Sequence, residues 1–415
     1  MERVSVEIWQ QILLKVMEMN DWPIFATSCT PYTFLTFIDL HDWHNGYQES
    51  YRKYLEQRRH LRLVCRAWNE FVLFTSHRWL QLEDSSPMYE LDSTTTARAK
   101  GGVGPVERLS MLRLWSDATP ILSWASPILK RPASQSPLRA YILRLHLNRT
   151  TAPRDSLFDD FLFGKTTTQD LECTNTSTAL HLLSIATIAP RCDVHIPFSL
   201  SQISRTFPGL RSLFLYSIQV TPQQTLTLAH LEVLSIFCPS ETLLESMKTW
   251  DTPALRHVSL GNFSMMSLTD VIDRFLGRWA HQIESLFCRK FDLLRSSMLA
   301  SPVLDLPSGF WAQFPVLRLL GLDGQALKRK EWSGWSVVPP PTHPCRYLVC
   351  CVYSVKEPED VGREVKTIRT KWTWHDGVRL VVGDSHGGQY YVVKNIRDNP
   401  SFANMERTVG ILPEL

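Results

Sequence analysis

A short apolar pattern recurs through the middle of the chain and limits what it can fold into. In each copy the first and second apolar residues are separated by two positions, and the second and third by one. The clear copies are Leu210/Leu213/Leu215, Leu231/Leu234/Ile236, Leu255/Val258/Leu260, Ile283/Leu286/Cys288 and Leu317/Leu320/Leu322, and weaker copies are Val106/Leu109/Met111, Ile142/Leu145/Leu147, Leu180/Leu183/Ile185 and Leu348/Cys351/Tyr353. The clear copies start 21, 24, 28 and 34 residues apart. Because the last two apolar positions alternate with a period of two, each copy predicts a buried strand.

Helical segments are predicted between these strands, for example over Ser240–Trp250 and Ser267–Trp279. Pro208, Pro253 and Pro315 each stand two residues before a clear copy, where a proline ends the preceding helix. The fold class predicted from this order of elements is α/β.

A strand, a turn and a helix repeated in this way resemble a degenerate leucine-rich repeat. The resemblance implies that residues 105–336 form an irregular solenoid with a parallel sheet on its concave side. A doubly wound α/β domain is the alternative. It would be expected to carry a glycine-rich phosphate loop after an early strand, and the sequence has none.

The concave face of such a solenoid is where a protein client would bind. The side chains between the apolar positions would point toward it, and the client-binding candidates are Phe214, Tyr216, Phe237, Arg256 and His257. Aromatic side chains are favoured among them because binding hot spots are rich in aromatic residues.

Two amphipathic helices are predicted near the N-terminus. Ser5 is a good N-cap for the first, whose apolar positions are Ile8, Trp9, Ile12, Leu13, Val16 and Met17. The second pattern runs from Tyr51 to about Phe74, with Leu61, Val64, Trp68 and Phe71 expected on one face. The arginines Arg58, Arg59, Arg62 and Arg66 are expected on the other side, mostly in solvent.

These helices together resemble an F-box. Val4-Ser5-Val6-Glu7-Ile8 is similar to the Leu-Pro-x-Glu-Ile opening of that family, and Leu61-Arg62-Leu63-Val64-Cys65-Arg66-Ala67-Trp68 to its Leu-x-Leu-Val-Cys-Arg-x-Trp helix. The chain departs from the family in Val4-Ser5 and in an insertion between the two halves at about 19–50, a layout similar to fungal F-box-like proteins. The resemblance implies a small α-helical module over residues 1–82 that docks the adaptor subunit of an SCF-type cullin ubiquitin ligase. The adaptor-binding residues would be Val4, Ile8, Trp9, Ile12, Leu13, Leu61, Leu63, Val64, Cys65 and Trp68.

Two further segments complete the predicted organisation. Residues 83–104 are rich in Ser, Thr and Gly and are interpreted as a flexible linker. A Pro-rich break at Pro339–Pro344 opens a short β-rich capping segment over residues 337–415, with strands expected over Arg346–Val355, Lys366–Trp374, Val378–Val382 and Gln389–Val393.

Other classes of function find little support in the sequence. Gly383-Asp384-Ser385-His386-Gly387 matches the elbow of serine hydrolases, but a strand rather than the required helix is predicted after it, so no catalytic residue and no enzyme are expected. His343, Cys345, Cys350 and Cys351 lack the second ligand pair of a zinc site, and no metal or cofactor is expected. A net charge of +3 is too small to indicate nucleic acid.

The expected location is cytoplasmic and/or nuclear. The acidic start does not match an export signal, and nine cysteines, an odd number, suggest reduced thiols. No apolar run is long enough to predict a membrane partner. The function expected is therefore a substrate receptor of an SCF-type ligase that binds the adaptor, and through it a cullin, together with a protein client. The alternative is a leucine-rich-repeat scaffold without a role in ubiquitin transfer.

Overall fold

The chain forms two compact units in the computed structural model. The first contains residues 1–27, 43–221 and 226–229, and the second contains residues 28–42, 222–225 and 230–415. The structure describes residues 7–10, 12–13, 29–30, 34, 56–74, 79–83, 108–115, 139–146, 180–188, 196–220, 224–261, 268–289, 306–307, 309–323, 337–352, 358–370, 372, 374–384, 389–393 and 405–409. The predicted linker beyond Glu83, Val4 and most of the insertion at 19–50 lie outside these residues.

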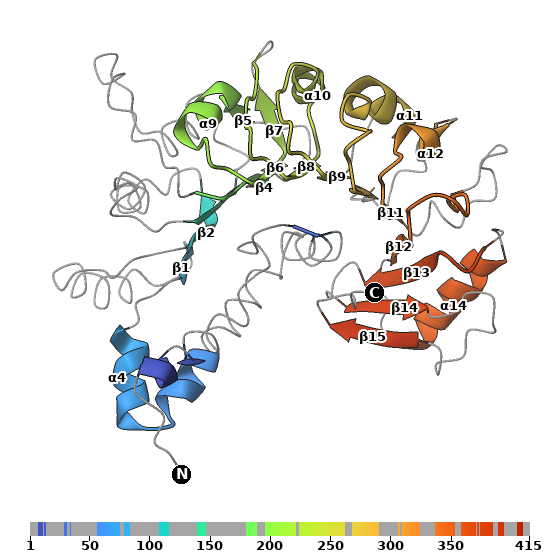
Figure 1. Ribbon diagram of the computed structural model, residues 1–415. Helices are drawn as coiled ribbons and strands as arrows, with labels where there is room; N and C mark the ends of the chain where they lie inside the picture. The colour runs from blue at the N-terminus through green and yellow to red at the C-terminus, as the bar shows by residue number, and fades with distance from the viewer. Residues whose placement is uncertain are drawn as a thin grey trace. The chain divides into compact units, whose positions relative to one another are not determined.

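Short helices form the start of the first unit. Residues 7–10 and 12–13 are helical, a second helix covers residues 56–62, and α4 (Arg66–Phe74) follows a turn at residues 63–64 (Figure 1). The small core of this helical module consists of Leu13, Leu61 and Val72, with Trp68 and Phe71 packed against it.

The continuous helical pattern predicted through residues 51–74 is wrong at the turn. Leu63 and Val64 donate their backbone N–H groups to the carbonyls three residues earlier, His60 and Leu61, which ends the first helix. In a straight helix Leu61 and Val72 would be about 16 Å apart, too far for both to share a core with Leu13. The turn brings them together.

After these helices, the strands of the first unit pair with one another in parallel. In order of adjacency they are β1 (Trp79–Glu83), β2 (Arg108–Trp115), β3 (Ala140–His146), β4 (Leu182–Ile188) and β6 (Ser212–Tyr216). The short strands β5 (Ile196–Phe198) and β7 (Ile218–Val220) pair separately, and α9 (Leu200–Thr206) lies between β5 and β6 in the sequence. β1 contains the last residues of the predicted F-box-like segment.

The second unit continues the same alternation of parallel strands and helices. Its strands are β8 (Val233–Phe237), β9 (His257–Gly261), β10 (Ser285–Arg289), β11 (Leu319–Asp323), β12 (Tyr347–Val352) and β13 (Arg379–Asp384), each parallel to the next. The intervening helices are α10 (Glu241–Met247), α11 (Leu268–Val271) with its π-helical continuation Ile272–Leu276, α12 (Phe310–Gln313) and α14 (Pro358–Arg369). Figure 1 shows α10, α11 and α12 on the same side of strands β8, β9 and β11. The predicted α/β class is confirmed at this level: a mostly parallel sheet alternates with helices.

All nine apolar patterns fall on or next to strands, and the pairing aligns the clear copies of the second unit. Leu234, Val258, Leu286 and Leu320 occupy one register position on adjacent strands, and all are buried. Two weak copies are out of frame with their neighbours, because Tyr141 rather than Leu145 pairs with Leu183, and Leu348 rather than Cys351 pairs with Leu320. Since both faces of these strands are apolar, the pattern alone could not set the frame.

Both faces of the central strands are buried. All five residues of β9 are buried, as are the first four of β6. On β8 and β10 an aromatic ring lies over the glycine at the paired position of the next strand, Phe237 over Gly261 and Phe287 over Gly321. Such two-sided burial is typical of parallel sheets.

The C-terminal part contains one helix where a strand was predicted. Residues 358–369 form α14, so the expected strand over Lys366–Trp374 is wrong. The buried residues Val365 and Ile368 are three apart, as on one face of a helix, and a parallel β12–β13 pair needs a crossover connection. β14 (Gln389–Val393) and β15 (Met405–Val409) then add antiparallel strands to β13.

Candidate functional site

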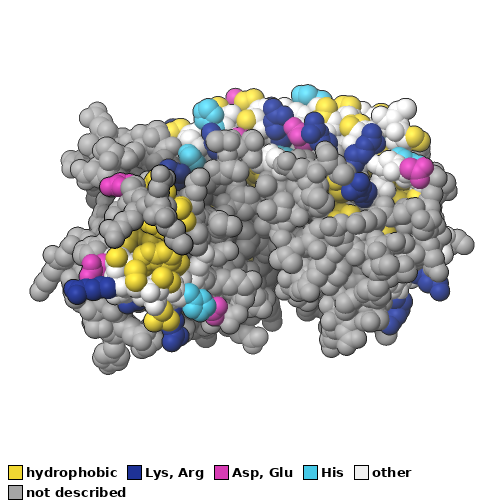
Figure 2. Space-filling view, turned by 60° about the horizontal axis from the view of Figure 1, so that its bottom comes forward, with side chains coloured by type: hydrophobic (Ala, Val, Ile, Leu, Met, Phe, Trp, Pro, Cys, Tyr) yellow, Lys and Arg dark blue, Asp and Glu magenta, His cyan; other side chains and the backbone are white. Residues whose placement is uncertain are grey.

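The helical module exposes a group of large apolar side chains. We call this group the apolar face; its members and their exposed fractions are Ile8 (53%), Trp9 (42%), Ile12 (41%), Leu63 (74%) and Val64 (58%). Among the described residues one other large hydrophobic residue is exposed, Val316, and it belongs to the second unit. Figure 2 shows hydrophobic side chains gathered over this module beside basic ones. Such a concentration of exposed apolar area is typical of a protein interaction surface.

The two halves of the motif divide their apolar residues between the core and this face. Leu13 and Leu61 point into the core, whereas Ile12 and Leu63, close to them in sequence, are exposed. The rings of Trp9 and Trp68 are 5.9 Å apart, so Trp9 joins the exposed face to the packed interior. The turn at residues 63–64 is what carries Leu63 and Val64 out of the core.

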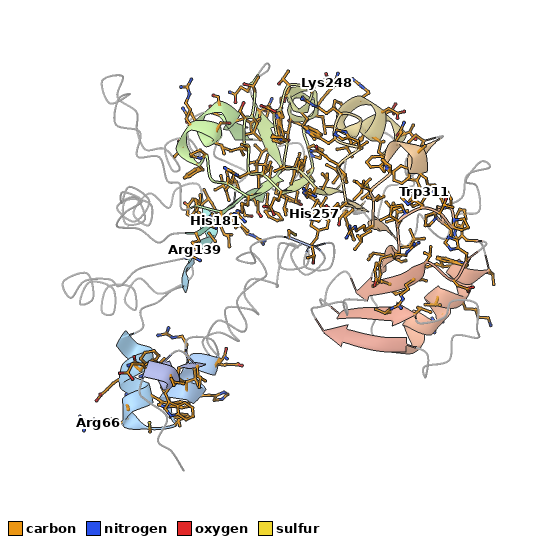
Figure 3. All side chains as sticks on the ribbon, viewed as in Figure 1. Arg66, Arg139, His181, Lys248, His257 and Trp311 are labelled. Carbon is orange, nitrogen blue, oxygen red and sulfur yellow. The ribbon has the colours of Figure 1, made fainter. Side chains whose placement is uncertain are left out.

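The arginines of the module have two different roles. Arg59, Arg62 and Arg66 are exposed as expected, and the side chain of Arg66 projects away from the helices (Figure 3). Arg58 is instead buried, which corrects the expectation that it is solvated: its guanidinium donates a 2.7 Å hydrogen bond to the carbonyl of Val72. This bond ties the helix of residues 56–62 to α4.

The ten predicted adaptor-binding residues are thus not equivalent. Cys65 is exposed beside the apolar face and Trp68 is half-buried behind it. Leu13 and Leu61 are buried, and Val4 lies outside the described residues. Six of the ten are therefore accessible to a partner as the structure stands, namely the five members of the apolar face and Cys65.

The five predicted client-binding residues also differ in exposure. Phe214 and His257 are buried, Tyr216 and Phe237 are half-buried, and Arg256 is exposed. Since the ring of Phe237 lies over Gly261, packing within the sheet accounts for its position.

His257 is the centre of a polar cluster on the strand face of the second unit; Figure 3 labels it. Its Nε2 donates to the carbonyl oxygen of Cys29 at 3.0 Å, and its Nδ1 accepts from the hydroxyl of Ser285 at 3.0 Å. The ring of Phe34 lies 5.3 Å from the imidazole, and Cys29 donates its N–H to Glu232 at 3.4 Å. Burial lowers the pKa of His257 to about 4, so the imidazole is neutral in the fold.

A row of charged residues precedes the strands of the second unit. Arg256 and Glu284, one residue before β9 and β10, form an ion pair of 2.6 Å, and Arg318, one residue before β11, lies 3.9 Å from the other oxygen of Glu284. Each of these three residues also donates its backbone N–H to the carbonyl of the residue that precedes the neighbouring strand. The acceptors are Glu232, Arg256 and Glu284, respectively. Glu284 was not among the predicted site residues, although it follows the first apolar residue of its copy of the pattern, Ile283, just as the predicted Arg256 follows Leu255.

Cys29 and Phe34 were missed for a different reason. Contacts across 203 and 228 residues leave no signal in one sequence.

His343 and Cys345 take part in local packing. Nε2 of His343 donates to the carbonyl of Phe314 at 3.0 Å, and its Nδ1 accepts from the N–H of Cys345 at 3.1 Å. Both ring nitrogens of His343 are therefore engaged within the protein. Burial raises the pKa of the Cys345 thiol to about 12. Over the residues that the structure describes, no three His, Cys, Asp or Glu side chains converge to hold a metal ion.

These features define an α/β protein in which parallel strands alternate with helices and an exposed apolar face lies on a small helical module. No protein family model matches the chain, and no curated protein is similar to its sequence. Among the described helices, none has the length and hydropathy needed to cross a bilayer.

Proposed function

We propose that the chain is a substrate-recognition subunit of an SCF-type cullin ubiquitin ligase. In this proposal the apolar face docks the adaptor, the irregular leucine-rich-repeat-like strands and helices hold a protein client, and other subunits carry out ubiquitin transfer. The observation that carries the proposal is the apolar face itself, because it combines exposed residues from both halves of the F-box-like motif: Ile8, Trp9 and Ile12 from the first, Leu63 and Val64 from the second.

Burial in a partner gives this face a physical purpose. Each large apolar side chain contributes about 1.5–3 kcal/mol when it moves from water into a packed environment. Leu63 is the most exposed member and contributes least to the module's own core. Its burial would therefore stabilise a complex far more than it stabilises the isolated chain.

The charged residues around the face fit the same proposal. Arg66 forms a 2.9 Å ion pair with Glu70, and Arg62 donates a 2.9 Å hydrogen bond to Asn69. Interfaces commonly have an apolar centre and a polar rim. A partner with a complementary apolar groove and a polar border would satisfy both parts.

Co-purification of the full chain with the SCF adaptor tests the proposal. Ile8→Asp and Ile12→Asp place a charge on the apolar face at exposed positions, so we expect both to abolish recovery of the adaptor without lowering the thermal midpoint. Val316→Asp is the matched control, since it places the same charge on an exposed apolar residue of the second unit.

Two results would count against adaptor docking. One is undiminished recovery of the adaptor with both variants. The other is a large loss of thermal stability in Ile8→Asp, which is the result predicted by the alternative scaffold function, in which these helices only cap the repeats.

A further inference from the structure

Part of the N-terminal insertion belongs to the second unit. Residues 28–42 group with residues 230–415, whereas the residues on either side, 1–27 and 43–221, form the first unit. The chain therefore leaves the first unit between the two halves of the F-box-like motif, contributes a short segment to the second unit and then returns.

This segment contacts the strand face through its backbone. The carbonyl of Cys29 accepts from His257 Nε2 at 3.0 Å, and the N–H of the same residue donates to Glu232 at 3.4 Å. The backbone of Cys29 thus bonds both to Glu232, which precedes β8, and to His257, which begins β9. Because only backbone atoms of Cys29 take part, a peptide of another sequence could make both bonds.

An aromatic side chain supplies the other described contact. The N–H of Phe34 donates to the carbonyl of Thr30, four residues earlier, at 2.9 Å. The fully buried ring of Phe34 lies 5.3 Å from the imidazole of His257. A ring at this spacing from the backbone bonds adds selectivity for sequence.

The strands of the second unit fix the groups that contact this segment. Ser285, on the neighbouring strand β10, donates to Nδ1 of His257 and so fixes the tautomer that presents an N–H at Nε2. Glu232 precedes β8, and His257 begins β9. The acceptor Glu232 therefore lies immediately before β8, and the donor His257 lies on β9, which pairs with β8.

We propose that Glu232, His257 and Ser285 form a peptide-binding site and that the segment from Cys29 to Phe34 occupies it as an internal ligand. The site takes a residue that offers both its N–H and its carbonyl, followed five residues later by an aromatic side chain. This inference rests on the proposed function only in naming the competing peptide as the client's. A client of this chemistry must displace the internal segment before it binds.

Competition in the full-length chain tests the inference. The probe is a fluorescent peptide with the sequence of residues 27–37, titrated into wild type and Phe34→Ala. Removal of the ring weakens the internal segment, so the peptide should bind Phe34→Ala roughly tenfold more tightly than wild type, as expected when a competing closed state becomes less populated. The peptide carrying Phe34→Ala itself should bind neither protein. Adding His257→Gln to Phe34→Ala should remove the binding, and Val316→Ala should leave the wild-type affinity unchanged.

Equal affinity for wild type and Phe34→Ala, or no binding to either, would overturn the inference. A second measurement needs no variant: hydrogen exchange of wild type should show amides of residues 29–34 exchanging at least about ten times faster than those of β8 and β9, because the segment detaches without unfolding of the sheet. Equal exchange rates would make the segment part of the core and would also overturn it. Loss of adaptor binding would leave both results unaffected, so failure of the proposed function is distinguishable from failure of this inference.

Discussion

His257 Nε2 lies 3.0 Å from the carbonyl oxygen of Cys29, although 228 residues separate the two in the sequence. The contact joins a segment of the N-terminal insertion to the second strand of the second unit. It also requires that the imidazole remain neutral, with Nε2 as donor and Nδ1 as acceptor from Ser285. The cluster therefore links the packing of the strand face to pH.

Acid should destabilise the second unit through His257. Burial lowers its pKa from 6.5 to about 4, against smaller opposing contributions from Glu284 and the Cys29 carbonyl and with a smaller lowering contribution from Arg256. The unfolded chain therefore binds a proton at higher pH than the folded one. The contribution of His257 to the free energy of unfolding is fully present above about pH 6.5 and is lost as the pH drops toward 4. The total loss is roughly 3 kcal/mol, at about 1.4 kcal/mol per pKa unit.

Urea unfolding of wild type and His257→Asn at pH 7.5 and pH 4.5 measures this effect. The pKa values of His181 and His343 are lowered by burial as well, so wild type alone would not isolate one residue. We expect the loss of stability between the two pH values to be smaller in His257→Asn. An equal loss would show that His257 does not cause it.

Gly321→Ala should destabilise the chain because Phe287 occupies the space that a side chain would need. A Cβ at Gly321 would lie 2.0 Å from the ring of Phe287, which is fully buried and packed. Overpacking of this kind costs about 1–3 kcal/mol. Gly362→Ala is the control, since a Cβ there meets nothing within 4 Å and Ala favours the helix α14 by up to about 1 kcal/mol. Chemical denaturation of both variants should give opposite signs, and a neutral Gly321→Ala would contradict the packing described.

Leu61→Ala and Leu63→Ala should differ sharply although they are two residues apart. Leu61 is 9% exposed and packs with Leu13 and Val72, so truncation should destabilise the helical module by about 2–5 kcal/mol. Leu63 is 74% exposed, and its truncation should change stability by less than about 0.5 kcal/mol. Hydrogen exchange of residues 56–74 reports on this module directly. Faster exchange in both variants would show that Leu63 belongs to the core.

Ser240→Ala should weaken α10 because it removes a helix cap. The Ser240 hydroxyl accepts a 3.2 Å hydrogen bond from the N–H of Leu243. Its loss should cost about 1 kcal/mol in urea unfolding. Ser199→Ala is the comparison, since Ser199 stands at the same position before α9 but its side chain makes no capping bond. Similar losses in the two variants would argue against capping as the cause.

The α/β class and the position of most strands could be predicted because buried strands need apolar residues at fixed spacing. The apolar pattern does not give the strand register: Tyr141 and Leu348 pair with the second apolar residue of the neighbouring copy although neither is the second apolar residue of its own, since strands apolar on both faces fit two frames. α14 was missed because a charged helix, in which Val365 and Ile368 are the buried residues among those whose burial is described, resembles a short strand in its last residues.

The division of the candidate site into core and surface could not be predicted. Leu61 and Leu63 have the same hydrophobicity, and only the turn that follows Arg62 decides which one is buried. The contact between Cys29 and His257 depends on a chain path through another unit, which no local pattern encodes.

Titration of the purified SCF adaptor into full-length wild type, Leu63→Asp and Val316→Asp tests adaptor docking most directly. Leu63 is the most exposed member of the apolar face, so a charge there should leave the fold intact. The proposal predicts that Leu63→Asp weakens binding by at least about thirtyfold, as expected for loss of an apolar contact of more than about 2 kcal/mol, while Val316→Asp binds like wild type. Equal affinity of all three proteins for the adaptor, or no binding by wild type, would contradict it.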